Sequence, residues 1–253
     1  MTLCASFAFS AVSFLPQSTQ SRRGEHGGNY LSLMKITKYI HSCLVFELDG
    51  YKVLFDPGNI TFAEGKVKPE TLAEAQAMVI THIHPDHFFA ENIRQILKIN
   101  NMMIYTTAEV SKALEKEKIK STVWQAGPHY LGPFKMQAIE VTHEPLLDAP
   151  TPQMLGFVIN DKVLHPADSM EDALLKYAGI ELLVMVTMAP FANELRIAGF
   201  ADKLQPKQIL PVHDGYAKEF FIKGRYANYL GHFKKQGIKY HEVYQPGDSV
   251  SIS

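Results

Sequence analysis

The sequence has little cysteine, no long hydrophobic run and no excess of one charge. Its 253 residues include two cysteines, 25 Lys and Arg and 26 Asp and Glu, and the formal net charge is −1. Cys4 and Cys43 lack metal-ligand spacing, so we expect free thiols in a reducing cytoplasm. The balanced charge predicts no nucleic-acid partner. No apolar run reaches the ~20 residues of a membrane-spanning helix, so no membrane partner is expected either.

The first 33 residues lack a regular hydrophobic pattern. Residues 1–15 are apolar. In a signal peptide, basic residues precede the apolar run, but here Arg22 and Arg23 follow it. Residues 18–29, "STQSRRGEHGGN", read as a flexible linker. We therefore predict a disordered N-terminal extension over 1–33 and one domain over 34–253.

From residue 34 onward, short strand patterns precede segments in which strands and helices alternate. Alternating apolar residues predict strands at 34–40, 43–48 and 51–56. The stretch "PETLAEAQ", residues 69–76, reads as a helix, and a buried strand at 77–81 leads to a further helix at 87–99. The second half repeats this order. Loops are expected at 57–70, 125–133 and 144–153. Two mixed sheets packed face to face, with helices outside, would bury these elements. The expected fold class is α/β.

The stretch "THIHPDHF", residues 81–88, follows the buried strand and carries three histidines and an aspartate. His82 and His84 are two positions apart, so both rings can face the same side of the chain. Pro85 then turns the backbone, and Asp86 and His87 approach from another direction. Imidazole and carboxylate ligands suit zinc, manganese or iron. A polar capping loop is the alternative, but capping explains one aspartate and not three histidines.

Three further polar residues stand where predicted strands end. His143 follows "AIEVT", Asp168 follows "KVLHPA" and His213 follows "QILPV". Each alone is typical of a turn or a cap. Side chains at the ends of different strands can converge on one cleft, so together they predict a metal site.

These motifs occur in the order found in a known superfamily. "LFDPG" with Asp56, "THIHPDHF", "THEP" with His143, "ADS" with Asp168 and "PVHDG" with His213 resemble the metallo-β-lactamase-fold hydrolases, from residue 34 to the end of the chain. The stretch "IHSCLVFE" around His41 further resembles the small hydrolases that include L-ascorbate-6-phosphate lactonase.

The resemblance implies a four-layer αββα sandwich with two divalent metal ions, zinc first, with manganese and iron as alternatives. It implies that His82, His84 and His143 hold one ion, that Asp86, His87 and His213 hold the other, and that Asp168 bridges them. Asp56 would orient the histidine-rich loop from behind the ligands. His41 would either line the pocket or be a buried ring bonded to backbone. Ala167 departs from the Gly-Asp pair usual in the fourth motif.

The implied reaction is hydrolysis of a small-molecule lactone, ester, amide or phosphoester by a metal-bound hydroxide. Asp86 would accept a proton and pass it to the leaving group. A phosphodiesterase or nuclease acting on RNA is one alternative, although no basic arm lies between the motifs. A di-iron oxidoreductase is another, but such proteins resemble H-x-E-x-D-H, and His84 stands where that glutamate would be.

Overall fold

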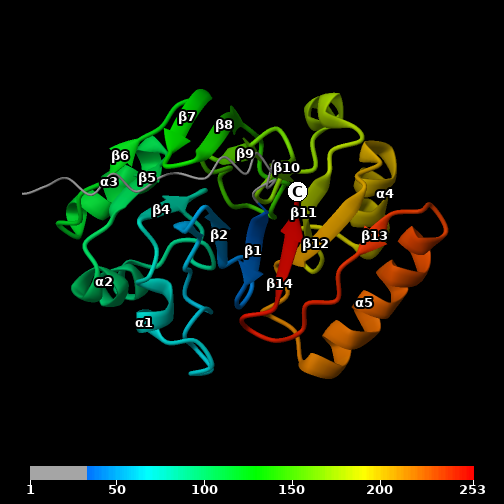
Figure 1. Ribbon diagram of the computed structural model, residues 1–253, viewed down its shortest axis with the longest axis horizontal. Coiled ribbons are helices and arrows are strands. Elements are labelled where there is room, and N and C mark those ends of the chain that lie inside the picture. Colours follow the sequence, from blue (N-terminus) through cyan, green and yellow to red (C-terminus); the bar gives the residue numbers. More distant parts are fainter. Residues whose placement is uncertain (1–32) are drawn as a thin grey trace, which may run out of the picture. The chain divides into compact units, whose positions relative to one another are not determined.

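The computed structural model describes residues 33–253, which form two seven-stranded mixed sheets (Figure 1). Apart from Leu33, the predicted extension lies outside the described residues, and its disorder stays a prediction. Within residues 33–253, no helix is long and apolar enough to cross a membrane. Cys43 is a buried free thiol.

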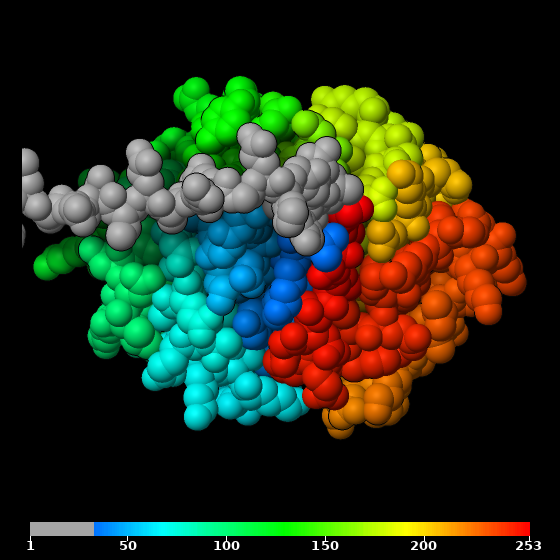
Figure 2. Space-filling model, in the orientation of Figure 1, coloured from blue at the N-terminus to red at the C-terminus, as the bar shows by residue number. Residues whose placement is uncertain are grey.

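The first sheet has the order β14-β1-β2-β3-β4-β5-β6. Its strands are β1 (Met34–Lys38), β2 (Leu44–Leu48), β3 (Tyr51–Phe55), β4 (Ala77–Ile80), β5 (Met103–Thr106), β6 (Thr122–Val123) and β14 (Ser249–Ile252). The pairs from β3 to β6 are parallel, and those from β14 to β3 are antiparallel. Figure 2 shows the last residues of the chain between the first strand and α5 (Glu219–Lys234).

The second sheet has the order β13-β12-β11-β10-β9-β8-β7. Its strands are β7 (Gly127–Leu131), β8 (Phe134–Glu140), β9 (Leu155–Ile159), β10 (Val163–His165), β11 (Leu182–Val186), β12 (Gln208–Val212) and β13 (Lys239–Tyr240). The pairs from β10 to β13 are parallel, and those from β7 to β10 are antiparallel.

Three hydrophobic clusters join four layers. Between the sheets, Phe46 and Phe55 pack with Phe157 and other buried residues. Helices α1 (Pro69–Leu72), α2 (Ala90–Ile99) and α3 (Ala108–Lys116) cover the outer face of the first sheet, and α4 (Glu194–Leu204) and α5 cover that of the second (Figure 1). The predicted αββα sandwich is therefore confirmed. Strands β4 and β11 are buried on both faces, as parallel strands under helices should be.

Two local predictions were wrong. The loop predicted at 125–133 contains β7, which pairs antiparallel with β8 at the edge of the second sheet. Gly127 and Pro128 suggested a turn, but an edge strand tolerates proline because one side of it needs no hydrogen bonds. The helix expected over 69–76 ends at Leu72, and a 3-10 helix, Asp172–Tyr177, was not expected.

The loop after β3 packs closely against the histidine-rich loop. Asn59 N–H donates to the Pro85 carbonyl at 2.8 Å, and Asn92 Nδ2 donates to the Gly58 carbonyl at 2.6 Å. A Cβ on Gly58 would lie 1.9 Å from the backbone oxygen of Asp86. Only glycine therefore fits at position 58 without displacing the loop that carries Asp86 and His87.

We expect Gly58→Ala to lower the free energy of unfolding by about 1–3 kcal/mol, because a side chain must be forced into a filled space. Gly199→Ala is the control: it lies in α4 with nothing within 4 Å of its added Cβ. It should stabilise the helix by about 0.5–1 kcal/mol. Chemical denaturation measures both, and equal stability of the two variants would contradict the close packing at Gly58.

Candidate metal centre

All the predicted site residues lie just after strands, or in the turn between two of them. Asp56 follows β3, the loop 81–88 follows β4, and His143 follows β8. Asp168 comes three residues after the end of β10, and His213 directly follows β12. Both sheets thus contribute side chains to one place.

The first group of possible metal ligands consists of His82, His84 and His143. One nitrogen of each ring lies within 4.8 Å of the others. His82 Nε2 and His84 Nδ1 are 3.1 Å apart, although they are two residues apart in sequence. The structure therefore brings together the three residues predicted for the first ion.

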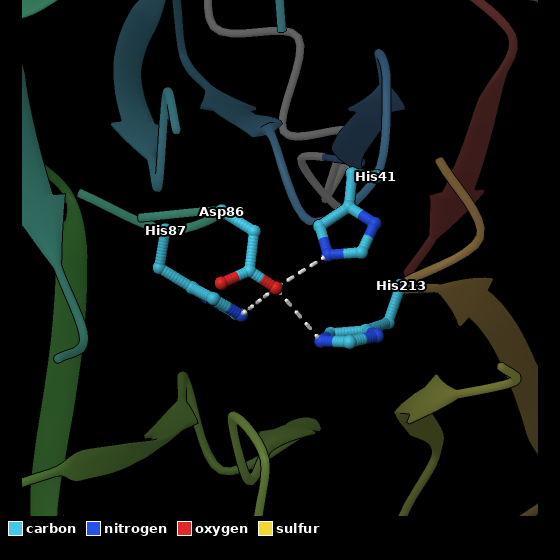
Figure 3. A group of neighbouring side chains, drawn as sticks. All are labelled: His41, Asp86, His87 and His213. Atoms are coloured by element: carbon cyan, nitrogen blue, oxygen red, sulfur yellow. Dashed lines mark hydrogen bonds and ion pairs between the residues drawn. The ribbon is translucent and has the colours of Figure 1, made fainter. Parts of the chain in front are cut away.

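The second group combines Asp86, His87 and His213 with His41 (Figure 3). Asp86 Oδ2 lies 3.2 Å from His213 Nε2 and 3.8 Å from His87 Nε2. The three residues predicted for the second ion are therefore together as well. His41 was not predicted to be a ligand, but it lies within the same distance limit.

Asp168 lies between the two groups. Its Oδ2 is 3.9 Å from His82 Nε2 and 3.4 Å from His143 Nε2 on one side. On the other side it is 3.3 Å from His87 Nε2 and 3.2 Å from His213 Nε2. One carboxylate thus reaches both sets of rings, which is the position that a bridging ligand needs.

Asp56 holds the histidine-rich loop from behind. Its Oδ1 accepts the Thr81 backbone N–H at 2.8 Å, and its Oδ2 accepts the Thr81 hydroxyl and His87 Nδ1–H, each at 2.8 Å. Because the Thr81 hydroxyl donates to Asp56, it can accept from His82 Nδ1–H at 3.0 Å. Both rings therefore turn their Nε2 lone pairs toward Asp168.

Backbone carbonyls orient the rings of His143 and His213, so that their Nε2 lone pairs are available to a metal ion. His143 Nδ1–H donates to the Glu144 carbonyl at 2.5 Å, and His213 Nδ1–H donates to the Met188 carbonyl at 2.6 Å. A hydrogen bond from one ring nitrogen fixes the tautomer, and the other nitrogen keeps its lone pair.

Several buried atoms at this place have no hydrogen-bond partner in the described part of the chain. They are His87 Nε2, His143 Nε2, His213 Nε2 and Asp168 Oδ1. A buried polar atom without a partner is costly and rare in native proteins. The three Nε2 atoms lie around the Asp168 carboxylate, 3.2–3.4 Å from its Oδ2, so the residues fit a bound cation.

The charges around the two groups differ. Burial lowers the pKa of His82 well below its ordinary value, and burial together with His143 lowers the pKa of His84. Burial also opposes charge on His213, but Asp168 and Asp86 outweigh it and raise the pKa of His213 to about 9. The carboxylates therefore attract positive charge to the second group. A bound cation would replace these protons.

The hydrogen bonds of His41 decide its role. Gly215 N–H donates to His41 Nδ1 at 3.0 Å, so the hydrogen of the neutral ring is on Nε2. This Nε2–H donates to Asp86 Oδ2 at 3.0 Å (Figure 3). Burial lowers the pKa of His41 to about 4, which keeps the ring neutral. The ring is thus bonded to backbone and also supports a predicted ligand, without offering a lone pair itself.

Sequence reasoning missed Tyr216. Its hydroxyl donates to Asp86 Oδ2 at 2.7 Å, although the ring is largely exposed. Burial and the neighbouring Asp86 raise the pKa of Tyr216, so its hydroxyl stays protonated. The neighbouring His213 and the hydrogen bond from His41 outweigh burial and hold the pKa of Asp86 well below its usual range. The only signal in the sequence was the position of Tyr216 three residues after His213.

The backbone is strained at four of these positions. His41, Asp56, Ala167 and His213 have φ values of 63°, 47°, 51° and 64°. Non-glycine residues adopt such angles rarely, and they cluster at functional sites. Ala167 therefore occupies a position at which glycine would be unstrained.

Comparisons with known proteins identify the family of this chain. A profile described as the beta-lactamase superfamily domain matches residues 35–213. A metal-dependent hydrolase of Exiguobacterium is 27% identical over 194 residues, covering 71% of this chain and 85% of the relative.

Two solved structures share the fold. A metallo hydrolase of Ignicoccus hospitalis has a TM-score of 0.63 at 18% identity and covers 87% of this chain and 99% of its own. CmlA, a diiron β-hydroxylase of Streptomyces venezuelae, has a TM-score of 0.62 at 12% identity, over 87% of this chain and 54% of its own. The chain belongs to the beta-lactamase superfamily. With its His and Asp cluster, it is a metal-dependent hydrolase of the metallo-β-lactamase fold.

We expect Asp56→Ala to weaken metal binding by about 10–100-fold, because the rings of His87 and His82 lose the acceptor that orients them. The buried donors left behind should also lower stability by about 1–3 kcal/mol. Zinc titration of metal-free protein measures the affinity. The exposed Asp172→Ala is the matched control and should bind zinc like the unmodified protein. An unchanged affinity in Asp56→Ala would remove Asp56 from this role.

At Ala167 we expect valine and glycine to behave differently. A β-branched side chain is strongly disfavoured at positive φ, so Ala167→Val should lower the free energy of unfolding by about 1–3 kcal/mol. Ala167→Gly relieves the backbone strain but loosens the unfolded chain, and should stay within about 1 kcal/mol of the parent. Thermal unfolding compares the two. Equal melting temperatures would show that the positive φ carries no strain.

Proposed function

We propose that the protein hydrolyses a small-molecule lactone, ester, amide or phosphoester at a centre of two divalent metal ions, with zinc as the first expectation. The observation that carries the proposal is the place of Asp168, whose Oδ2 lies within 3.9 Å of histidines from both groups. A single shared carboxylate between two sets of imidazoles suits two neighbouring cations.

The ligand assignments follow the two groups. His82, His84 and His143 would hold the first ion, Asp86, His87 and His213 the second, and Asp168 both. Nitrogen and oxygen ligands accept zinc, manganese or iron, and no thiolate belongs to any of these groups in the described residues. When bound, such ions lower the pKa of a water ligand to near 7 and polarise a carbonyl or phosphoryl oxygen.

Asp86 is the residue that we propose moves the proton. Its Oδ2 already accepts hydrogen bonds from His41 and Tyr216, whereas its Oδ1 accepts none from the described residues. Oδ1 is therefore the atom available to accept a proton from the attacking water and return it to the leaving group. His41 and Tyr216 act through Asp86 by fixing the plane of its carboxylate.

The alternatives lead to different observations. An RNA nuclease would need contacts to phosphates, for which the net charge of −1 offers little attraction. A di-iron oxidoreductase would absorb visible light and consume oxygen. The likeness to CmlA concerns the fold alone.

The test combines metal analysis with a substrate panel. We expect between one and two transition-metal ions per chain in protein prepared without chelator. Lactones, carboxylic esters, amides and phosphodiesters are then assayed with zinc and with manganese. Chelation should abolish hydrolysis and added metal should restore it.

Asp168→Ala should lower kcat/KM by more than about a hundredfold, because the bridging carboxylate is needed to keep both ions in place. Asp172→Ala serves again as the exposed control. Protein that contains no metal, or hydrolysis that survives both chelation and the loss of Asp168, would overturn the proposal.

A further inference from the structure

An open groove of ≈ 740 Å³ lies beside the metal centre. It is lined by the turn after β11, the loop after β12 and the first two turns of α5, through residues that include Met188, Ala189, Ala192, Tyr216, Phe221 and Arg225. The lining is mostly hydrocarbon. Its volume is within the range of about 300–1,000 Å³ that small-molecule sites occupy.

Two residues in the walls of the groove contact the predicted metal ligands. The Met188 carbonyl accepts the hydrogen bond that orients His213, and Tyr216 donates to Asp86. Phe191, in the same turn, lies 5.0 Å from the ring of His143 and 5.6 Å from that of His213. The walls of the groove therefore stand directly beside the rings of the predicted ligands.

The polar groups of the groove already have partners. Asn193 Oδ1 accepts the Arg196 N–H at 2.9 Å and caps α4. Arg225 pairs with Glu194 at 3.4 Å, and its guanidinium lies over the ring of Phe221 at 5.4 Å. With these charges neutralised by each other, the groove offers a ligand mainly apolar surface.

Large apolar side chains remain uncovered here. Tyr216 is 58% exposed and Phe221 is 47% exposed. Single exposed hydrophobic residues are common, but two aromatic rings on one groove next to a cluster of possible metal ligands mark a binding surface. Burial of this surface by a hydrocarbon chain would release water from both partners.

We infer that the groove binds the hydrocarbon chain of the substrate, so that the preferred substrates are esters or amides of medium-chain fatty acids. The inference rests on the proposed hydrolysis at the metal centre and adds to it a substrate class. The acyl carbonyl lies at the metal centre, and the chain runs past Phe191 and Tyr216 into the groove.

The experiment uses the full chain loaded with zinc and p-nitrophenyl esters from acetate to decanoate. The leaving group stays constant, so only the acyl chain varies. We expect kcat/KM to rise by about two- to fourfold for each added methylene until the groove is filled.

Two neighbouring phenylalanines of α5 provide matched variants. Phe221 lines the groove, whereas Phe220 does not and is 75% exposed. Phe221→Ser should reduce the preference for decanoate over acetate by at least tenfold, and Phe220→Ser should leave it unchanged. Ala192→Trp, which fills the groove, should shorten the preferred chain while acetate is still hydrolysed.

The outcomes separate the inference from the proposed function. Chelator-sensitive hydrolysis with no dependence on chain length, or with the same dependence in Phe221→Ser, overturns the inference and leaves the proposed function standing.

A binding experiment covers the case in which no ester is hydrolysed. Metal-free protein is titrated with a dansyl-labelled undecanoate, and the fluorescence of the dansyl group is followed. Saturable one-to-one binding supports the inference that the groove binds a hydrocarbon chain, if Phe221→Ser weakens this binding at least tenfold and Phe220→Ser does not. The proposed hydrolysis would then fail on its own. Absence of saturable binding overturns the inference.

Discussion

The carboxylate of Asp56 is the constraint on which the metal centre depends. It is fully buried at the end of β3 and accepts three hydrogen bonds, two from Thr81 and one from His87. Through the Thr81 hydroxyl it also orients His82. One side chain therefore sets the direction of a ring in each predicted ligand group. Because β3 and β4 are parallel neighbours, their ends lie together and the carboxylate reaches the loop without a long connection.

The second sheet supplies the opposite half of the centre, and a buried ion pair supports it. Lys38 Nζ lies 2.9 Å from Asp214 Oδ2, which also accepts the hydroxyl of Tyr226 at 2.5 Å. This contact joins β1, the loop that carries His213, and α5. Breaking a buried pair leaves an uncompensated charge, so the loop has few other conformations available to it. The positive φ of His213 is maintained by this surrounding structure.

Asp86 connects the candidate metal centre to the groove that we propose binds substrate. His41 and Tyr216 donate to the same oxygen of Asp86 from opposite ends of the chain, which leaves the other oxygen for proton transfer. Tyr216 also lines the groove. The side chain that fixes the predicted acid–base residue is thus part of the wall that a hydrocarbon chain would contact. In the reaction and substrate class that we propose, Tyr216 would serve both proton transfer and substrate choice.

Local pattern was enough to predict most of the strands and helices and the polar residues that follow strands at 82–87, 143, 168 and 213, because apolar periodicity and polar residues after strands can be read from neighbouring positions. Asp56 and His41 entered through the family resemblance, and the ligand roles stay predictions. The positions of His82 and His84 two residues apart already implied a shared face. Local pattern could not predict contacts between distant parts of the chain. Gly215, which bonds to His41, lies 174 residues away from it, and Asp86, which bonds to Tyr216, lies 130 residues away. Such contacts depend on how the two sheets pack, and this packing is a property of the whole folded chain. The same holds for β7, whose Gly127 and Pro128 favour a turn until β8 pairs with them, and for the groove, whose walls come from three separate segments.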